Sequence, residues 1–225
     1  MTKENADCWL TERCSRVDCD GFCLRHFKLS RMYDDALMSL RQRRHVRLYL
    51  EAGEPDGDAF AHLAAVERGI VGFVGGGGNL YISSSNTGNG KTSWALRMVQ
   101  AYFDRIWYQA DSSCHALFVH VPRFLLSLKD NISQRNEYAE HIKANATSAD
   151  LVVWDEIGTK GLTQFEHENI LNYVNARLDA GKANIYTSNL SNDELRSAIG
   201  DRLYSRIALA SDCVVLRGKD KRGLR

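Results

Sequence analysis

The chain lacks any apolar stretch long enough to cross a lipid bilayer, which argues against a membrane protein. Its first nine residues, MTKENADCW, contain no apolar signal-peptide core, which argues against secretion. Internal repeats and long low-complexity tracts are absent as well. With 44% apolar and 25% charged residues, the composition is that of an ordinary globular protein. We therefore expect a cytoplasmic protein without a membrane partner, whose six cysteines stay reduced.

An excess of charge of one sign is also missing, because 29 Lys and Arg residues stand against 28 Asp and Glu residues. The charges are nevertheless unevenly distributed. Residues 24–47 carry seven basic side chains against two acidic ones, residues 217–225 carry five against one, and residues 51–68 carry five acids against one Arg. Basic ends favour contacts with a polyanion, and a plainly solvated surface is the alternative explanation.

Short apolar segments alternate with helical patterns over the last two-thirds of the chain. Helical spacing of apolar residues covers 24–40, 59–74, 92–107, 137–146 and 164–180. Strands are expected at 79–84, 115–121, 151–154, 185–187 and 213–216. This alternation predicts an α/β fold with a five-stranded parallel sheet that helices cover on both faces.

The first of these strands leads into residues 85–92, SNTGNGKT, which match the P-loop pattern GxxxxGK[ST] except for Ser85. Gly88 and Gly90 allow backbone N–H groups to converge on a phosphate, and the next helix directs its positive end there. We expect Lys91 to reach the β- and γ-phosphates of ATP and Thr92 to coordinate Mg²⁺. The residues expected to touch the nucleotide are Asn86, Thr87, Gly88, Asn89, Gly90, Lys91, Thr92 and Ser93.

An apolar strand that ends in two acids, LVVWDE at 151–156, matches the Walker B pattern that accompanies a P-loop. Because parallel strands end at the same edge of a sheet, Asp155 should lie beside the P-loop and help to orient Mg²⁺. Glu156 is then placed to polarise the attacking water as a general base. The sequence therefore predicts an ATPase site.

Two later features bear on the same site. Asn189 follows the strand at 185–187, where it could contact the water or the γ-phosphate, although a helix N-cap is the alternative role. Arg202 and Arg206 lie four residues apart on one face of a short helix. One guanidinium could enter a neighbouring subunit's site and neutralise transition-state charge, or both could form surface ion pairs.

The segments GNGKT, VVWDEIG, YTSNLS and GDRLYSRI together resemble the DnaC/DnaI family of bacterial helicase loaders, and phage-encoded members most of all. The resemblance covers roughly residues 75–220, in the family's order. It implies an AAA+ ATPase core at 75–225 without a C-terminal lid, preceded by a helicase-docking module at 1–50 and a linker with a helix at 51–74. Arg206 would be the trans-acting finger through which copies associate, and Arg202 would support it. The implied catalytic residues are Lys91, Glu156, Asn189 and Arg206.

The family also implies a function and its partners. Such proteins grip a DnaB-type hexameric helicase and place it on single-stranded DNA in the bacterial cytoplasm. The predicted DNA contacts are Arg123 and Lys129, because related initiators place DNA-binding helices after the second strand. Phe124 could stack on a base, but its helical spacing with Leu125 and Leu128 favours the core. Residues 41–47 and 217–225 are rival basic patches.

Four cysteines, Cys8, Cys14, Cys19 and Cys23, fall within sixteen residues. Their thiolates can close a tetrahedral Zn²⁺ site, and metal binding would supply folding energy to a segment with little apolar material. His26 is an alternative ligand, and unligated thiols on a tail are the alternative to zinc. DnaI-type loaders carry a zinc module that docks on the helicase, and residues 1–50 look similar. The remaining cysteines, Cys114 and Cys213, are expected in the core.

Two other functions remain open. An IstB-like transposition helper ATPase shares these core motifs, and a zinc adaptor could bind nucleotide without hydrolysing it. The cysteine-rich start favours the loader over the helper, and Glu156 and Asn189 argue against the adaptor.

Overall fold

A computed structural model describes residues 8–14, 21, 23–50, 53–158 and 161–220 of the chain. Its sheet has five parallel strands in the order β2-β3-β4-β1-β5, which confirms the predicted α/β fold. Each expected strand lies within two residues of an observed one. The bounds are β1 Asn79–Ser83, β2 Ala116–His120, β3 Leu151–Asp155, β4 Ala183–Ser188 and β5 Asp212–Val215.

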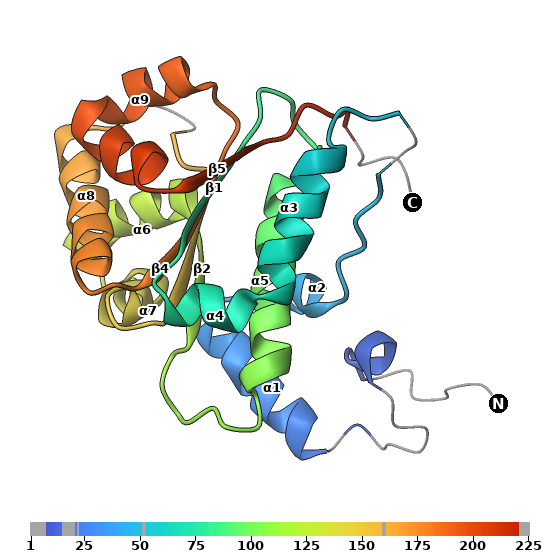
Figure 1. The fold of residues 1–225 in the computed structure, drawn as a ribbon. Coiled ribbons are helices and arrows are strands. Elements are labelled where there is room, and N and C mark those ends of the chain that lie inside the picture. Colours follow the sequence, from blue (N-terminus) through green and yellow to red (C-terminus); the bar gives the residue numbers. More distant parts are fainter. Residues whose placement is uncertain (1–7, 15–20, 22, 51–52, 159–160, 221–225) are drawn as a thin grey trace.

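Helices cover both faces of the sheet (Figure 1). One layer consists of α1 Leu24–Asp35, α2 Leu40–Arg43, α3 Gly57–Arg68, α4 Ile70–Gly75 and α5 Lys91–Ile106. The other consists of α6 Val121–Ser133, α7 Glu137–Asn145, α8 Gln164–Asp179 and α9 Asn192–Tyr204. In the part of the chain that the structure describes, none of these helices combines the length and apolar character needed to cross a membrane.

The strands present alternate side chains to the two helical layers, because side chains in a strand point to opposite faces with a period of two. In β3, Leu151 and Val153 pack on the side of α5, whereas Val152 and Trp154 pack on the side of α6 and α8. All four side chains are fully buried. Each such side chain contributes about 1.5–3 kcal/mol when buried, so β3 is held firmly from both faces.

Two expected helices are each divided into two. The segment expected as a helix at 24–40 breaks after α1, because Leu37 has a φ of 60° and Ser39 then caps α2. Gly69 likewise separates α3 from α4 within the segment expected at 59–74. Apolar spacing continues across both breaks, so periodicity alone did not reveal them.

The N-terminal segment packs on the same core as the sheet. Leu29 and Tyr33 of α1 belong to the apolar cluster that contains Phe103 of α5. Arg13 donates a hydrogen bond to Asp104 of α5 over 2.9 Å. The division of the chain into modules at residues 50 and 74 stays a prediction.

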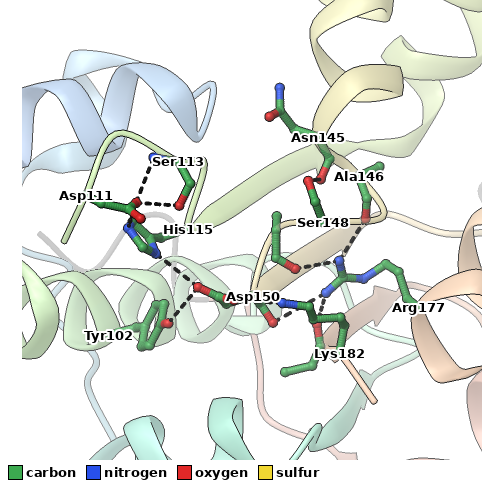
Figure 2. Close-up of polar contacts among 12 residues, drawn as sticks. Tyr102, Asp111, Ser113, His115, Asn145, Ala146, Ser148, Asp150, Arg177 and Lys182 are labelled. Atoms are coloured by element: carbon green, nitrogen blue, oxygen red, sulfur yellow. Dashed lines mark hydrogen bonds and ion pairs between the residues drawn. The ribbon is translucent and has the colours of Figure 1, made fainter. Parts of the chain in front are cut away.

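A polar network joins the starts of three strands (Figure 2). The Asp150 carboxylate, just before β3, contacts His115 Nδ1 at 3.0 Å and accepts a hydrogen bond from Lys182 Nζ over 2.9 Å. The contact with His115 holds the pKa of Asp150 down at about 2, and it raises the pKa of His115. Arg177 of α8 is fully buried and donates to the carbonyl oxygens of Ala146 and Ala149 over 2.7 and 2.8 Å. The network fastens the edge of the sheet opposite the P-loop.

Candidate active site

The P-loop connects β1 to α5 at the carboxyl edge of the sheet. Gly88 and Gly90 have φ values of 72° and 108°, a region that residues with a β-carbon rarely adopt. Gly90 precedes α5, and its carbonyl accepts the helical hydrogen bond from Trp94 over 2.8 Å. The positive end of α5 is therefore directed at the loop, which suits an anion such as phosphate.

The structure brings the P-loop and the acidic strand end together. Thr92 Oγ1 donates a hydrogen bond to Asp155 Oδ1 over 2.9 Å. Lys91 is buried, and its Nζ donates to the Asn86 carbonyl oxygen over 2.8 Å and to Asn89 Oδ1 over 3.2 Å. A cation, a hydroxyl and a carboxylate thus meet around one loop.

Thr187 at the end of β4 is a site residue that the sequence analysis missed. Its Oγ1 donates to Asp155 Oδ1 over 2.8 Å and accepts from Glu156 N over 3.0 Å. Burial raises the pKa of Asp155 above its ordinary value, although the hydrogen bonds from Thr187 and Thr92 partly oppose this rise. In the sheet, β4 lies between β1, which leads into the P-loop, and β3, which ends in the two acids. The end of β4 therefore lies beside both. Only the strand order could have shown this.

His120 at the end of β2 is a second missed residue. Its Nε2 lies 3.1 Å from Glu156 Oε2, and its Nδ1 accepts from Arg123 N over 3.3 Å. We therefore assign the proton of the neutral ring to Nε2, which donates to Glu156. Glu156 itself has a φ of 60°, which is uncommon for a residue with a β-carbon. His120 pairs with Asp155 in the sheet register, so its place at a neighbouring strand end was the available signal.

Comparisons with known proteins give a fold but no close relative. No protein-family model and no curated protein matches the sequence. The crystal structure of the DnaC helicase loader has a TM-score of 0.60 at 19% identity, over 75% of this chain and 93% of that one. The crystal structure of DnaI has a TM-score of 0.60 at 17% identity, over 82% of this chain and 94% of that one. The structure of the replication initiator DnaA bound to AMPPCP and single-stranded DNA has a TM-score of 0.54 at 14% identity, over 75% of this chain and 47% of that one. The chain has the AAA+ fold of these proteins.

Within this AAA+ fold, Asn189 directly follows β4 and is half-buried. The N-cap of α9 is Ser191, whose side chain accepts from Glu194 N and forms a capping box with that residue. Arg202 and Arg206 are exposed and lie beyond a kink of α9 at Gly200, where φ is 77°. Their guanidinium groups are therefore accessible to a second molecule.

The remaining residues of the P-loop differ in how far their side chains are exposed to solvent. Thr87 is exposed and Ser93 is half-buried, whereas Asn89 is fully buried. The Asn89 side chain donates to Ser84 Oγ at the end of the preceding strand. The P-loop is thus held in place from the inside by the buried Asn89 side chain.

Three of the four N-terminal cysteines are described, and Cys19 lies outside the described residues. Cys23 caps α1, where its Sγ accepts from His26 N over 3.3 Å. Among the described residues, no three His, Cys, Asp or Glu side chains come together as a metal site. Cys8 and Cys14 pack partly buried against the core. The expectation that Cys213 is a core residue is wrong, because it is exposed on the edge strand β5.

The predicted DNA contacts lie on α6 and already have partners within the AAA+ fold. The Arg123 guanidinium stacks on Tyr138, 4.1 Å from the ring centroid. Lys129 Nζ lies 3.0 Å from a carboxylate oxygen of Glu166, a side chain that is only 1% exposed. Phe124 is fully buried, as its spacing predicts.

Proposed function

We propose that the chain is an ATPase that loads a DnaB-type replicative helicase onto single-stranded DNA. The observation that carries the proposal is the hydrogen bond between Thr92 and Asp155, which joins P-loop and acidic strand end in the fold of the DnaC helicase loader. The DnaA structure with the same fold contains AMPPCP and single-stranded DNA, which supports the same ligands here.

In this proposal Lys91 exchanges its contacts with Asn86 and Asn89 for the β- and γ-phosphates of ATP. The oxygen atoms of Thr92 and Asp155 are the donor type that fits Mg²⁺, which would neutralise phosphate charge when bound. Asn189 contacts the attacking water or the γ-phosphate. The remaining P-loop residues bind phosphate through their backbone N–H groups.

Glu156 is the general base of the proposed hydrolysis. It accepts the proton of the attacking water, and His120 fixes its carboxylate by donating to Oε2. Because Thr187 also holds the Glu156 backbone, the base is positioned from two neighbouring strands. The arrangement favours hydrolysis over nucleotide binding alone.

Replacing Glu156 tests this role. We expect Glu156→Gln to bind ATP with unchanged affinity and to lose turnover by about 10²–10⁴-fold, because an amide cannot accept the proton. Equilibrium ATP binding and phosphate release are the measurements. Glu168→Gln, an exposed change on α8, is the matched control and should hydrolyse ATP normally. Normal turnover in Glu156→Gln would remove Glu156 from its proposed role.

Co-purification with the host's DnaB-type helicase, with and without ATP, tests the loader function. We expect a complex whose amount depends on ATP, and release of the helicase onto single-stranded DNA. If the chain hydrolyses ATP but captures no helicase under either condition, the loader function is wrong while the ATPase proposal stands. The transposition-helper alternative would then be favoured.

The proposal includes Zn²⁺ at the four N-terminal cysteines and docking of residues 1–50 on the helicase. In support, a β-carbon built on Gly21 would lie 3.9 Å from the β-carbon of Cys8, so the two ends of the cysteine-rich segment approach each other. Leu24 and Phe27 of α1 are 66% and 67% exposed, which suits a docking face. Metal analysis of the purified chain tests the zinc, and a metal-free, fully folded chain would contradict it.

The proposed DNA contacts are Arg123 and Lys129, with the basic segments 41–47 and 217–225 as rivals. Binding through Arg and Lys to phosphates releases counterions, so affinity for a single-stranded oligonucleotide should fall steeply as salt is added. An affinity that stays constant between low and high salt would contradict all of these contacts.

A further inference from the structure

The chain beyond β5 lies against the P-loop. Asn89 Nδ2 donates to the Leu216 carbonyl oxygen over 3.2 Å. Asn86 Nδ2 donates to the carbonyl oxygens of Arg217 and Gly218 over 3.1 and 3.2 Å. In Figure 1 this segment runs from β5 toward the upper end of α3. Two of the predicted nucleotide-contacting side chains are thus bound to the C-terminal segment.

A buried carboxylate anchors the segment. Asp56, directly before α3, is 1% exposed and accepts hydrogen bonds from Arg217 N over 2.7 Å and Gly218 N over 2.8 Å. Charge-assisted hydrogen bonds of this kind are about twice as strong as neutral ones. A β-carbon at Gly218 would lie 2.6 Å from Asp56 Oδ2, so the absence of a side chain at Gly218 allows this close approach. Asp56 therefore acts as a fixed anchor for residues 217 and 218.

Two residues beyond the anchor, the Asp220 carboxylate lies directly on the P-loop. A β-carbon built on Gly88 would overlap with the carboxylate oxygens and Cγ of Asp220. Gly88 is one of the two P-loop glycines with positive φ. The loop and the start of α5 favour negative charge, so the carboxylate is stabilised where a phosphate would bind.

We propose that Asp220 competes with the phosphates of ATP for the P-loop. Asp56 holds the anchor at Arg217 and Gly218, and residues 219–220 form an arm that moves away when ATP binds. This inference rests on the proposed function, because it requires a P-loop that binds ATP. Two anions cannot share the loop, since they repel each other and the carboxylate lies in contact with Gly88. ATP must displace the carboxylate in order to bind, and the free energy that this displacement costs makes the ATP affinity of the intact chain lower than that of a chain without the carboxylate.

Equilibrium ATP binding to the full-length chain tests the arm. We expect Asp220→Asn to bind ATP about tenfold more tightly than the intact chain, because the competing charge is removed. Asp220→Lys should bind ATP at least as tightly as Asp220→Asn does, because the charge is reversed. Asp220 is exposed, so both variants should fold. Asp179→Asn, an exposed change at the end of α8 and remote from the loop, is the matched control and should leave the affinity unchanged.

The outcomes separate this inference from the proposed function. If the intact chain binds ATP and neither Asp220 variant binds it more tightly, the competing arm is wrong and the proposed function stands. If the intact chain and all variants fail to bind ATP, the proposed function is wrong and the inference falls with it. In hydrogen exchange, the amides of Arg217 and Gly218 should stay protected when ATP is added; loss of their protection would contradict the fixed anchor.

Discussion

At the scale of single residues, one hydroxyl group positions both acids of the candidate site. Thr187 Oγ1 donates to Asp155 and accepts from the backbone of Glu156, so its donor and one of its acceptor positions are both used. Thr187 is 1% exposed, and water therefore cannot replace it. The geometry of the acids depends on this side chain.

Thr187→Val tests that dependence, because valine has the same shape without the hydroxyl. We expect turnover to fall by about 10–100-fold and the free energy of unfolding to fall by about 1–2 kcal/mol, since two buried polar groups lose a partner. Thr187→Ser keeps the hydroxyl and should retain most of the turnover. Steady-state ATPase assays and urea unfolding are the measurements. Equal turnover in the valine and serine variants would show that the hydroxyl does not position the acids.

At the scale of elements, both edges of the sheet are fastened by polar side chains at strand ends. The carboxyl edge holds the candidate site, and the opposite edge holds the network of Asp150, His115 and Lys182. The sequence allowed the strands to be located to within two residues, because apolar runs and turn residues mark them locally. It did not show their order, on which the approach of Thr187 and His120 to the acids depends.

The network at the strand starts predicts a dependence of stability on pH. The pKa of Asp150 lies below its ordinary 3.8, so its contribution is present above that value and is lost as pH falls toward about 2. The pKa of His115 is raised above 6.5, so its contribution is present below pH 6.5 and is lost as pH rises through the raised value. The chain should therefore gain most from this pair between about pH 4 and 6.5.

Asp150→Asn should lower the free energy of unfolding by about 1 kcal/mol in that range, because the pair is partly solvated. It should also return the titration of His115 in NMR spectra toward its ordinary pKa. Urea unfolding over a pH series is the measurement, with Asp179→Asn as the control. Superimposable stability profiles for Asp150→Asn and the intact chain would show that the pair contributes nothing.

At the scale of the whole molecule, the proposed role of the exposed Arg206, which lies beyond the kink of α9, makes the proposed activity depend on assembly. We expect Arg206→Ala to bind ATP normally but to lose turnover by about 10³-fold, because the guanidinium acts in a neighbouring copy's site. Mixing Arg206→Ala with Glu156→Gln should restore turnover, since one chain then supplies the arginine and the other the base. ATPase assays over a concentration series measure this. Failure of the mixture to regain activity would contradict self-association through Arg206.

By itself, the sequence determined the α/β class, the P-loop and the two acids, because apolar alternation and glycine spacing act over neighbouring residues. The exposed position of Cys213 was missed because it depends on β5 lying at the sheet edge. Only the tertiary structure decided that Thr187 and His120 hold the acids and that Asp220 lies on Gly88. These contacts join segments that are far apart along the chain. The order of the strands and the course of the C-terminal segment follow from the packing of the whole molecule, and local chemistry does not determine them.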